Sequence, residues 1–298
     1  MSHVHLKEGI AKALFVAAAG ISILAVALIC VFLFANGVPA IAQIGLPEFL
    51  FGTTWRPAND VYGIFPMIVG SIYVTAGAIV VGVPTGLLCA IFLSRFASGR
   101  VAAVLKPGVE LLAGIPSVIY GLLGILILNP LMYKLEMIIF ANSESHQFTG
   151  GANLISAVLV LALMILPTVI NISESALRSV PKHLKSASLA LGATYVQTIF
   201  KVIVPAAKSG IITAVVLGTG RAIGEAMAIS LVSGSSVNFP LPFNSVRFLT
   251  TAIVSEMSYS QGLHREVLFT IGLVLFVFIM IINISLTRIL KKGDRENE

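Results

Sequence analysis

Six stretches of this sequence carry almost no charged residue, and this feature limits more than any other what the chain can fold into. Five of them hold no Asp, Glu, Lys or Arg, and the sixth, residues 209–246, is interrupted only by Arg221 and Glu225. A helix needs about 20 mostly apolar residues to cross a bilayer core of about 30 Å, and each stretch is long enough. We therefore predict six membrane-spanning helices, over residues 13–36, 64–93, 111–133, 152–172, 209–233 and 267–287.

The composition agrees with a membrane protein. Only 11% of the 298 residues are charged and 57% are hydrophobic, against roughly 25% charged in an average soluble domain. We therefore predict an all-α polytopic membrane protein in which residues 1–298 form a single transmembrane domain. Cys30 and Cys89 both fall within predicted spans, so we expect no disulfide framework. The five histidines show no metal-ligand spacing, and we predict no metal site.

The basic residues indicate how the chain is oriented. The two tails and the loops after the second and fourth predicted spans hold 14 of the 19 Lys and Arg residues. The loops on the other side hold four, and Arg221 lies within a span. Such an excess is typical of the cytoplasmic side of a membrane protein, so we predict that both termini are cytoplasmic. Because topology explains the basic excess, we expect contact with membrane lipid and no nucleic-acid surface.

The longest of these cytoplasmic segments, residues 173–208, has the pattern of a docking element. Two apolar helical pieces flank Gly192; the first begins near Pro181, since proline is favoured in a first helical turn, and the second begins near Thr194. A short helix, a glycine turn and a second helix could insert into a groove of a partner protein. The alternative is an ordinary amphipathic connector that lies on the membrane surface.

The chain lacks a nucleotide-binding signature of its own. A phosphate-binding loop requires Gly-x-x-x-x-Gly-Lys-Ser/Thr, and no Gly-Lys dipeptide occurs in the sequence. If transport is driven by ATP, a separate polypeptide must bind ATP and Mg and hydrolyse the ATP.

Arg221 and Glu225 are the most informative residues, because they lie inside a predicted span. A charged side chain at a helix centre costs about 2.5–3.5 kcal/mol on insertion scales. The two residues are four apart and so lie on one helix face, where each can offset part of the other's cost. Gly218, Gly220 and Gly224 leave room for close approach of a helix or for a ligand. One interpretation is a structural ion pair; the other is a path for an anion, since the planar guanidinium matches a tetrahedral oxyanion.

Glu225 favours one kind of anion. Hydrogen phosphate can donate a proton to a carboxylate, whereas sulfate, fully deprotonated at neutral pH, cannot, so the carboxylate would repel the wrong anion. Without a ligand, Glu225 could pair with Arg221 and hold the path closed. We expect two other acids to have no such role: Glu110 at a helix N-terminus, and Glu256 solvated in the last extracytoplasmic loop.

Several segments resemble the PstC family of phosphate ABC transporter permeases. The motif GRAIGEAMAI, residues 220–229, is similar to the signature of that family's fifth helix. The segment from Arg178 to Gly210 is similar to the coupling loop of ABC importer permeases, although Ser186 stands where that loop usually has a glutamate. Three more segments agree with the PstC family: WRPANDVYGIFPMIVGSIYVT (55–75), ELLAGIPSVIYGLLG (110–124) and GLHREVLFTIGLVLF (262–276).

The resemblance implies a type I ABC importer permease in the cell inner membrane, which gives phosphate alternating access and does no covalent chemistry. Its implied partners are a PstA-like permease, a dimer of ATPase subunits that binds ATP and Mg, and an extracytoplasmic phosphate-binding protein. The alternatives are a molybdate or sulfate permease of the same architecture, or a stand-alone secondary anion transporter. The resemblance assigns the substrate path to Gly220, Arg221, Gly224 and Glu225, and ATPase coupling to Ala187, Leu191, Gly192, Ala193, Ile203 and Pro205.

Overall fold

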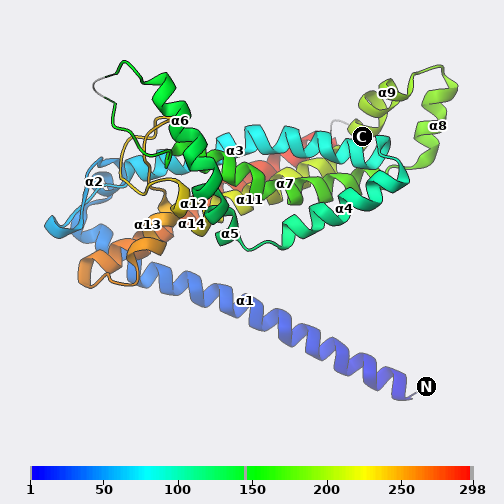
Figure 1. Cartoon of the computed structure of the whole chain (residues 1–298). Coiled ribbons are helices and arrows are strands. Elements are labelled where there is room, and N and C mark those ends of the chain that lie inside the picture. Colours follow the sequence, from blue (N-terminus) through cyan, green and yellow to red (C-terminus); the bar gives the residue numbers. More distant parts are fainter. Residues whose placement is uncertain (1, 144–145, 296–298) are drawn as a thin grey trace.

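The computed structural model describes residues 2–143 and 146–295, so residues 1, 144–145 and 296–298 of the predicted domain lie outside the described residues. The described chain is helical apart from its loops and one antiparallel pair of short strands, which confirms the predicted all-α class (Figure 1). The helices longer than ten residues are α1 (Ser2–Ile44), α3 (Phe65–Ile91), α4 (Gly99–Gly114), α6 (Asn129–Ile139), α7 (Leu154–Ser179), α11 (Lys208–Gly224) and α14 (Gly262–Arg295).

Shorter elements connect these helices. The two strands, β1 (Trp55–Arg56) and β2 (Val61–Tyr62), form a hairpin around the 3₁₀ turn η1 (Pro57–Asn59). Three π-helical turns, η2 (Phe92–Phe96), η3 (Gly124–Leu128) and η4 (Ile199–Ile203), extend neighbouring helices. The short α-helices are α2 (Leu46–Phe51), α5 (Ser117–Leu123), α8 (Lys182–Ala190), α9 (Tyr195–Thr198), α10 (Val204–Ala206), α12 (Met227–Val232) and α13 (Leu249–Glu256).

The centre of the bundle is the packing of α3 and α11 on α7. Small residues of α3 let the helices approach closely: a Cβ at Gly82 would lie 2.8 Å from Ile165, and one at Gly86 would lie 2.8 Å from Val169. Close approach through small residues is the usual way for helices to associate in a membrane, where hydrophobic burial gives no driving force. This packing gives α11, which carries Arg221, a rigid support.

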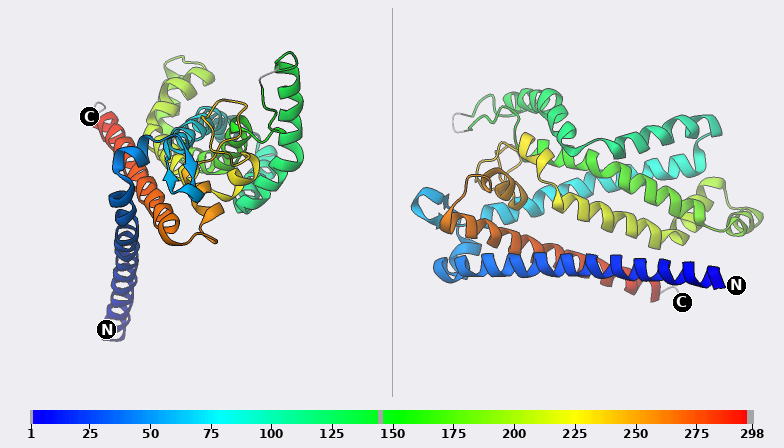
Figure 2. Two further views of the ribbon diagram at one scale, coloured as in Figure 1. Left: turned by 90° about the vertical axis from the view of Figure 1, so that its left-hand side faces the viewer. Right: turned by 90° about the horizontal axis from the view of Figure 1, so that it is seen from below.

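The first helix behaves differently from the rest. Near its C-terminal end α1 packs on α14, where Thr270 Oγ1 donates to the Gly37 carbonyl at 2.7 Å. Residues 8–29 are exposed, and this half of α1 runs away from the bundle (Figures 1 and 2). Because these residues are almost all apolar, their natural surroundings are lipid or another membrane helix rather than water.

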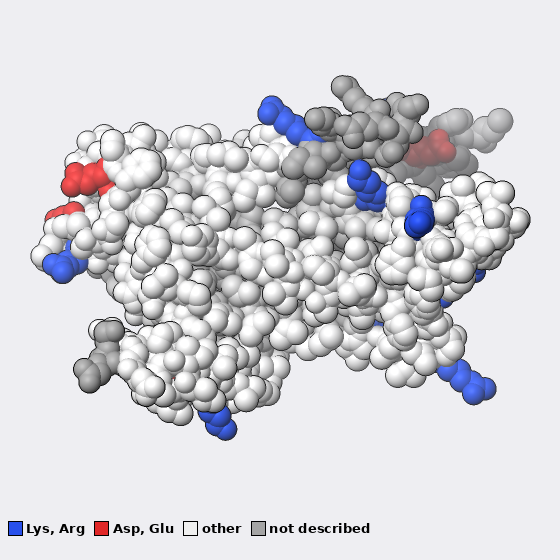
Figure 3. Space-filling view, turned by 90° about the horizontal axis from the view of Figure 1, so that it is seen from above, with Lys and Arg blue, Asp and Glu red and all other residues white. Residues whose placement is uncertain are grey.

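On the face shown in Figure 3, charged groups lie toward the two ends and at the rim, with a broad uncharged area between them. The hairpin end, defined by β1, β2 and α13, holds a buried cluster that we call the hairpin-end triad: Arg247, Glu256 and His264. The α8 end, defined by α8 and α9, holds the α8-end triad: Lys106, Glu174 and Arg178. The prediction that Glu256 is a solvated loop residue is wrong, because only 6% of it is exposed.

Among the residues that the structure describes, five helices are long and apolar enough to cross a membrane, or up to six if the pair of helices bent by 68° at Ala207 counts as one span. The predicted ends of the spans differ from those of the helices. The third spanning helix covers Ser117–Ile139, because the chain is extended at Ile115, before Pro116, and α4 therefore ends at Gly114. Glu110 consequently lies inside α4, and its predicted place at a helix N-terminus is wrong.

The fourth spanning helix is longer than predicted. α7 continues to Ser179 and takes in residues 173–179, which we had placed in the cytoplasmic loop. Its last turns carry the i, i+4 ion pair between Glu174 and Arg178, which stabilises a polar helix end. The rest of the predicted loop is also largely helical, from α8 through α10.

Candidate functional site

The fifth predicted span, residues 209–233, is broken in the middle. α11 ends at Gly224, Glu225 has extended backbone angles (φ −72°, ψ 132°), and α12 begins at Met227. The prediction that Arg221 and Glu225 share one face of a continuous helix is therefore wrong. The two residues instead lie on either side of the end of α11, where the helix carbonyls lack partners within the helix.

Glu225 is held by three hydrogen bonds at this break, the weakest of which runs from its backbone N–H to the Ala222 carbonyl at 3.4 Å. Its carboxylate Oε1 accepts from the backbone N–H of Ala228 at 2.9 Å, in the first turn of α12. Its backbone carbonyl accepts from Thr250 Oγ1 on α13 at 2.8 Å. Within the described part of the chain, no partner is recorded for the second carboxylate oxygen, Oε2, so Glu225 keeps a lone-pair face for another group.

Arg221 is half-buried and little engaged. Its Nη1 donates to Thr168 Oγ1 of α7 at 3.4 Å, and this is the only partner recorded for the guanidinium among the described residues. Tyr120 of α5 lies close enough to interact with it electrostatically. An arginine has five N–H donors, so most of them are available to an anion. The predicted ion pair with Glu225 is not present between these two described residues.

The three glycines around Arg221 face different surroundings. A Cβ at Gly218 would lie 3.2 Å from Val169, so this glycine lets α11 pack on α7. A Cβ at Gly220 or Gly224 would meet nothing within 4 Å. One side of α11, next to Arg221, is therefore left open by this chain, and Gly220 and Gly224 keep that side free of side chains.

Sequence reasoning missed Thr168, Tyr120 and Thr250. Each is an ordinary polar residue in its own segment, and only the packing of α7, α5 and α13 around the end of α11 brings it to the site. A hydroxyl inside a spanning helix, such as that of Thr168, is the sort of signal that could have pointed to it, since polar side chains in membrane helices tend to bond across helices.

The predicted coupling residues divide into two groups. Ala187, Leu191 and Gly192 lie at the exposed α8–α9 turn, and Leu191 is 89% exposed. Gly192 has φ +84°, a left-handed conformation that ends α8 and that glycine adopts without strain. The second helical piece begins as predicted at Thr194, whose hydroxyl and the Gln197 side chain form a capping box. Ala193 is half-buried beside this turn.

Ile203 and Pro205 have other surroundings. Ile203 is buried in a cluster with Leu177, Ile199 and Ala90, so it anchors the coupling segment to α7 and α3 and is not available to a partner. Pro205 lies exposed in α10, just before the bend at Ala207 that leads into α11. The coupling segment is thus an exposed turn carried on a buried apolar base.

The family model that matches this chain is that of the binding-protein-dependent transport system inner membrane component, over residues 82–294. A probable ABC transporter permease protein, YqgH of Bacillus subtilis, is 38% identical over 93% of this chain and 90% of its own length. Phosphate transport system permease proteins PstC of Pasteurella multocida and Haemophilus influenzae are 32% and 34% identical, covering 82% and 77% of this chain and 79% and 76% of their own lengths.

A solved structure of the MetNI methionine ABC transporter in an inward-facing conformation shares the fold. Its matching chain is 19% identical, with a TM-score of 0.53 over 78% of this chain and 94% of that chain. The helical architecture, the family model and the curated relatives agree with one another. The chain therefore belongs to the binding-protein-dependent transport system inner membrane components, as a multi-pass permease subunit of an ABC importer.

Proposed function

We propose that this permease imports inorganic phosphate. The observation that carries the proposal is the placement of Arg221, whose guanidinium keeps most of its donors free beside the open side of α11. The names of the curated PstC relatives support phosphate as the substrate. A guanidinium with free donors fits a tetrahedral oxyanion bidentately, and its incomplete burial lets the anion reach it.

Glu225 lets the site discriminate hydrogen phosphate from other oxyanions. Its free Oε2 accepts the proton of hydrogen phosphate, whereas sulfate and molybdate present no proton and meet only a negative charge. Because Glu225 is bonded to Ala228 rather than to Arg221, the arginine is open to substrate. Alternating access then consists of exposing this site to one side of the membrane and then to the other.

The remaining surfaces suit the partners that such an importer needs. The exposed α8–α9 turn, with Leu191 at its tip, inserts into a groove of an ATPase subunit that holds ATP and Mg. A PstA-like permease lies across the open side of α11 and closes the path. An extracytoplasmic phosphate-binding protein delivers its ligand at the hairpin end, and both termini lie on the cytoplasmic side with α8, as the basic residues indicate.

Uptake of labelled phosphate by cells that express the chain with its partners tests the proposal. We expect Arg221→Gln to assemble and to lower uptake at least about 100-fold, the loss of two charge-assisted hydrogen bonds of about 1.5–3 kcal/mol each. Lys134→Gln, at an exposed position of α6 outside the hairpin end, is the matched control and should transport normally. Normal phosphate uptake by Arg221→Gln would refute the proposed site.

Competition with unlabelled oxyanions tests the substrate. An excess of sulfate or molybdate should leave wild-type uptake of phosphate unchanged, and Glu225→Gln should make both anions competitors. Strong competition in the wild type would leave the importer architecture in place and overturn the assignment of phosphate.

A further inference from the structure

The α13 helix lies between two polar sites of the molecule. It is eight residues long, so its ends lie about 12 Å apart at 1.5 Å per residue. One end lies against the break at Glu225 and the other against the hairpin-end triad. Sequence reasoning assigned no role to this segment.

The first end of α13 is bonded to two transmembrane elements. Thr250 Oγ1 donates to the carbonyl of Glu225 at 2.8 Å, and the Leu249 N–H donates to Ser71 Oγ of α3 at 3.1 Å. Thr250 is buried, so its hydroxyl has no ready alternative partner in water. The carbonyl of Glu225 follows the last residue of α11 and depends on such an outside donor.

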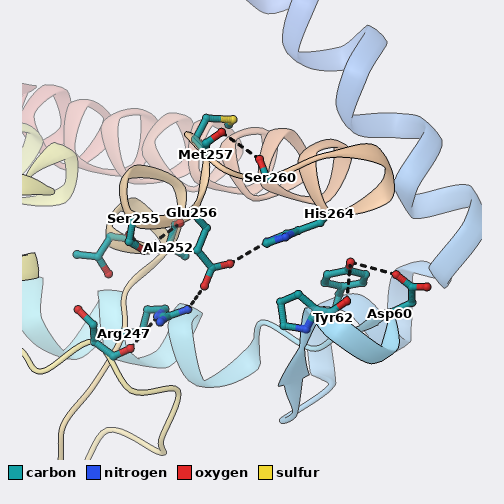
Figure 4. Close-up of polar contacts among 12 residues, drawn as sticks. Asp60, Tyr62, Arg247, Ala252, Ser255, Glu256, Met257, Ser260 and His264 are labelled. Carbon is teal, nitrogen blue, oxygen red and sulfur yellow. Dashed lines mark hydrogen bonds and ion pairs between the residues drawn. The ribbon is translucent and has the colours of Figure 1, made fainter.

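The second end of α13 is held by charge. The Glu256 carboxylate accepts from Arg247 Nη1 and, at 2.8 Å, from His264 Nε2 of α14 (Figure 4). Arg247 also donates through Nε to the Ser235 carbonyl at 2.8 Å, which ties in the loop that follows α12. A buried carboxylate with two such partners has one strongly preferred position, because leaving either partner would leave a charge uncompensated.

The hairpin lies against the same cluster. The His264 ring centroid is 5.9 Å from that of Tyr62 and 6.1 Å from that of Trp55. Contacts therefore run without interruption from the hairpin, through His264, Glu256 and α13, to the backbone of Glu225.

We propose that Thr250 is a positioning residue for Glu225, and that the hairpin-end triad sets the place of α13 so that Thr250 can act. Glu225 is fixed from two directions: Ala228 holds its carboxylate and Thr250 holds its carbonyl. Removing the Thr250 hydroxyl frees the peptide to rotate, which turns the carboxylate away from the orientation that receives a protonated anion. The inference rests on the proposed role of Glu225 in selecting phosphate.

Transport by the assembled complex tests this with Thr250→Val, which keeps the shape of the side chain and removes the hydroxyl. We expect uptake at low phosphate to fall about fivefold, the size that loss of one net hydrogen bond implies, and sulfate to become a competitor. Thr250→Ser should restore wild-type behaviour. Ser255→Ala is the matched control, because among the described residues the Ser255 hydroxyl bonds only to carbonyls of its own helix.

A double-mutant cycle with Glu225→Gln separates positioning from a merely structural role. If Thr250 acts through Glu225, Thr250→Val should add little to the sulfate sensitivity of Glu225→Gln. Independent, multiplying effects, or a Thr250→Val variant as selective as Ser255→Ala, would overturn the inference. Should Thr250→Val fail to assemble, Glu256→Asp makes the same test from the other end of α13: it keeps the charge, shifts the helix, and should admit sulfate.

The two proposals fail in different ways. If Arg221→Gln and Glu225→Gln both transport and select normally, the proposed site is wrong. If they fail while Thr250→Val and Glu256→Asp match Ser255→Ala, the site stands and the positioning role of α13 does not.

Discussion

The two ends of this permease each bury one carboxylate between two basic side chains, yet they do so differently. In the hairpin-end triad, the partners of Glu256 are themselves mostly buried: the Arg247 and His264 side chains are 18% and 16% exposed. In the α8-end triad, the partners of Glu174 remain in contact with solvent: the Lys106 and Arg178 side chains are 46% and 51% exposed.

The difference in the exposure of the basic partners determines how strongly each ion pair is coupled. A charge pair removed from water on both sides is strongly coupled, and loss of one partner leaves the other uncompensated. A pair whose cations remain hydrated is screened, and water can replace the missing partner. The hairpin end is therefore built to keep one arrangement, whereas the α8 end, which carries the exposed α8–α9 turn, can exchange its ion pairs at little cost.

The largest effect that this comparison predicts is for Arg247→Met. The change leaves Glu256 with one partner and the Ser235 carbonyl with none, so we expect a loss of about 3–5 kcal/mol in the free energy of unfolding. The fluorescence of Trp55, the single tryptophan, measures unfolding of this end in the purified chain. Arg265→Met, at an exposed neighbouring arginine, is the control, and equal unfolding midpoints for the two variants would contradict the prediction.

A smaller effect is expected from His264→Phe. The phenyl ring keeps the packing against Tyr62 and Trp55 but removes the N–H from which Glu256 accepts a hydrogen bond. We expect this loss to lower the free energy of unfolding by about 1–3 kcal/mol. His264→Gln restores a donor and should recover part of the loss, measured by the same Trp55 fluorescence. If His264→Phe is as stable as the wild type, ring packing rather than the hydrogen bond holds this end together.

Arg178→Met at the α8 end should cost about 1 kcal/mol or less, because the guanidinium that it removes is half in water. Circular dichroism of the purified chain during thermal unfolding provides the measurement, since Trp55 lies at the other end. We expect a similarly small loss of stability for Lys106→Met. A loss comparable to that of Arg247→Met would show that both ends hold their carboxylates equally tightly, which would contradict the proposed difference between the two ends.

The same contrast explains what the sequence could predict. Charge-free runs are local, so the long helices follow from them, with errors at their ends and at the break inside residues 209–233. The helix start at Thr194 and the glycine turn at Gly192 are also local, and both lie where we predicted. Arg221 and Glu225 could be singled out from the sequence, because the cost of a charge within a predicted span depends on composition alone.

The geometry of the site depends on contacts that are distant in sequence. The break at Glu225 is completed by Thr250, and the burial of Glu256 depends on Arg247 and His264 from other elements. The pattern of apolar residues along a sequence does not indicate such contacts. It therefore led to the predictions of a continuous helix over residues 209–233 and of a solvated Glu256, and both were wrong. Ile203 shows the same limit: its spacing fits the coupling loop, but only the fold reveals that it faces inward.

The smallest effect concerns Tyr62, at the edge of the hairpin end. Burial, followed by the Asp60 carboxylate that accepts its hydrogen bond and by Glu256, raises the pKa of Tyr62 to about 12. At pH 7 the phenol is neutral with or without these groups, so Tyr62→Phe should cost only about 0.5 kcal/mol, the low end for a hydrogen bond.

The pH range in which Tyr62 matters follows from the direction of that shift. A raised pKa in the folded state means that its stabilisation is complete below pH 10 and is lost as the pH rises through 12. The Tyr62 and Trp55 rings lie 5.4 Å apart, so an ionised Tyr62 should quench the Trp55 fluorescence with a midpoint near pH 12, in a phase that Tyr62→Phe lacks. A midpoint near 10 would contradict the raised pKa. Glu256→Gln removes one of the negative charges that oppose ionisation, and should therefore move the midpoint downward, whereas Glu174→Gln at the α8 end should leave it unchanged.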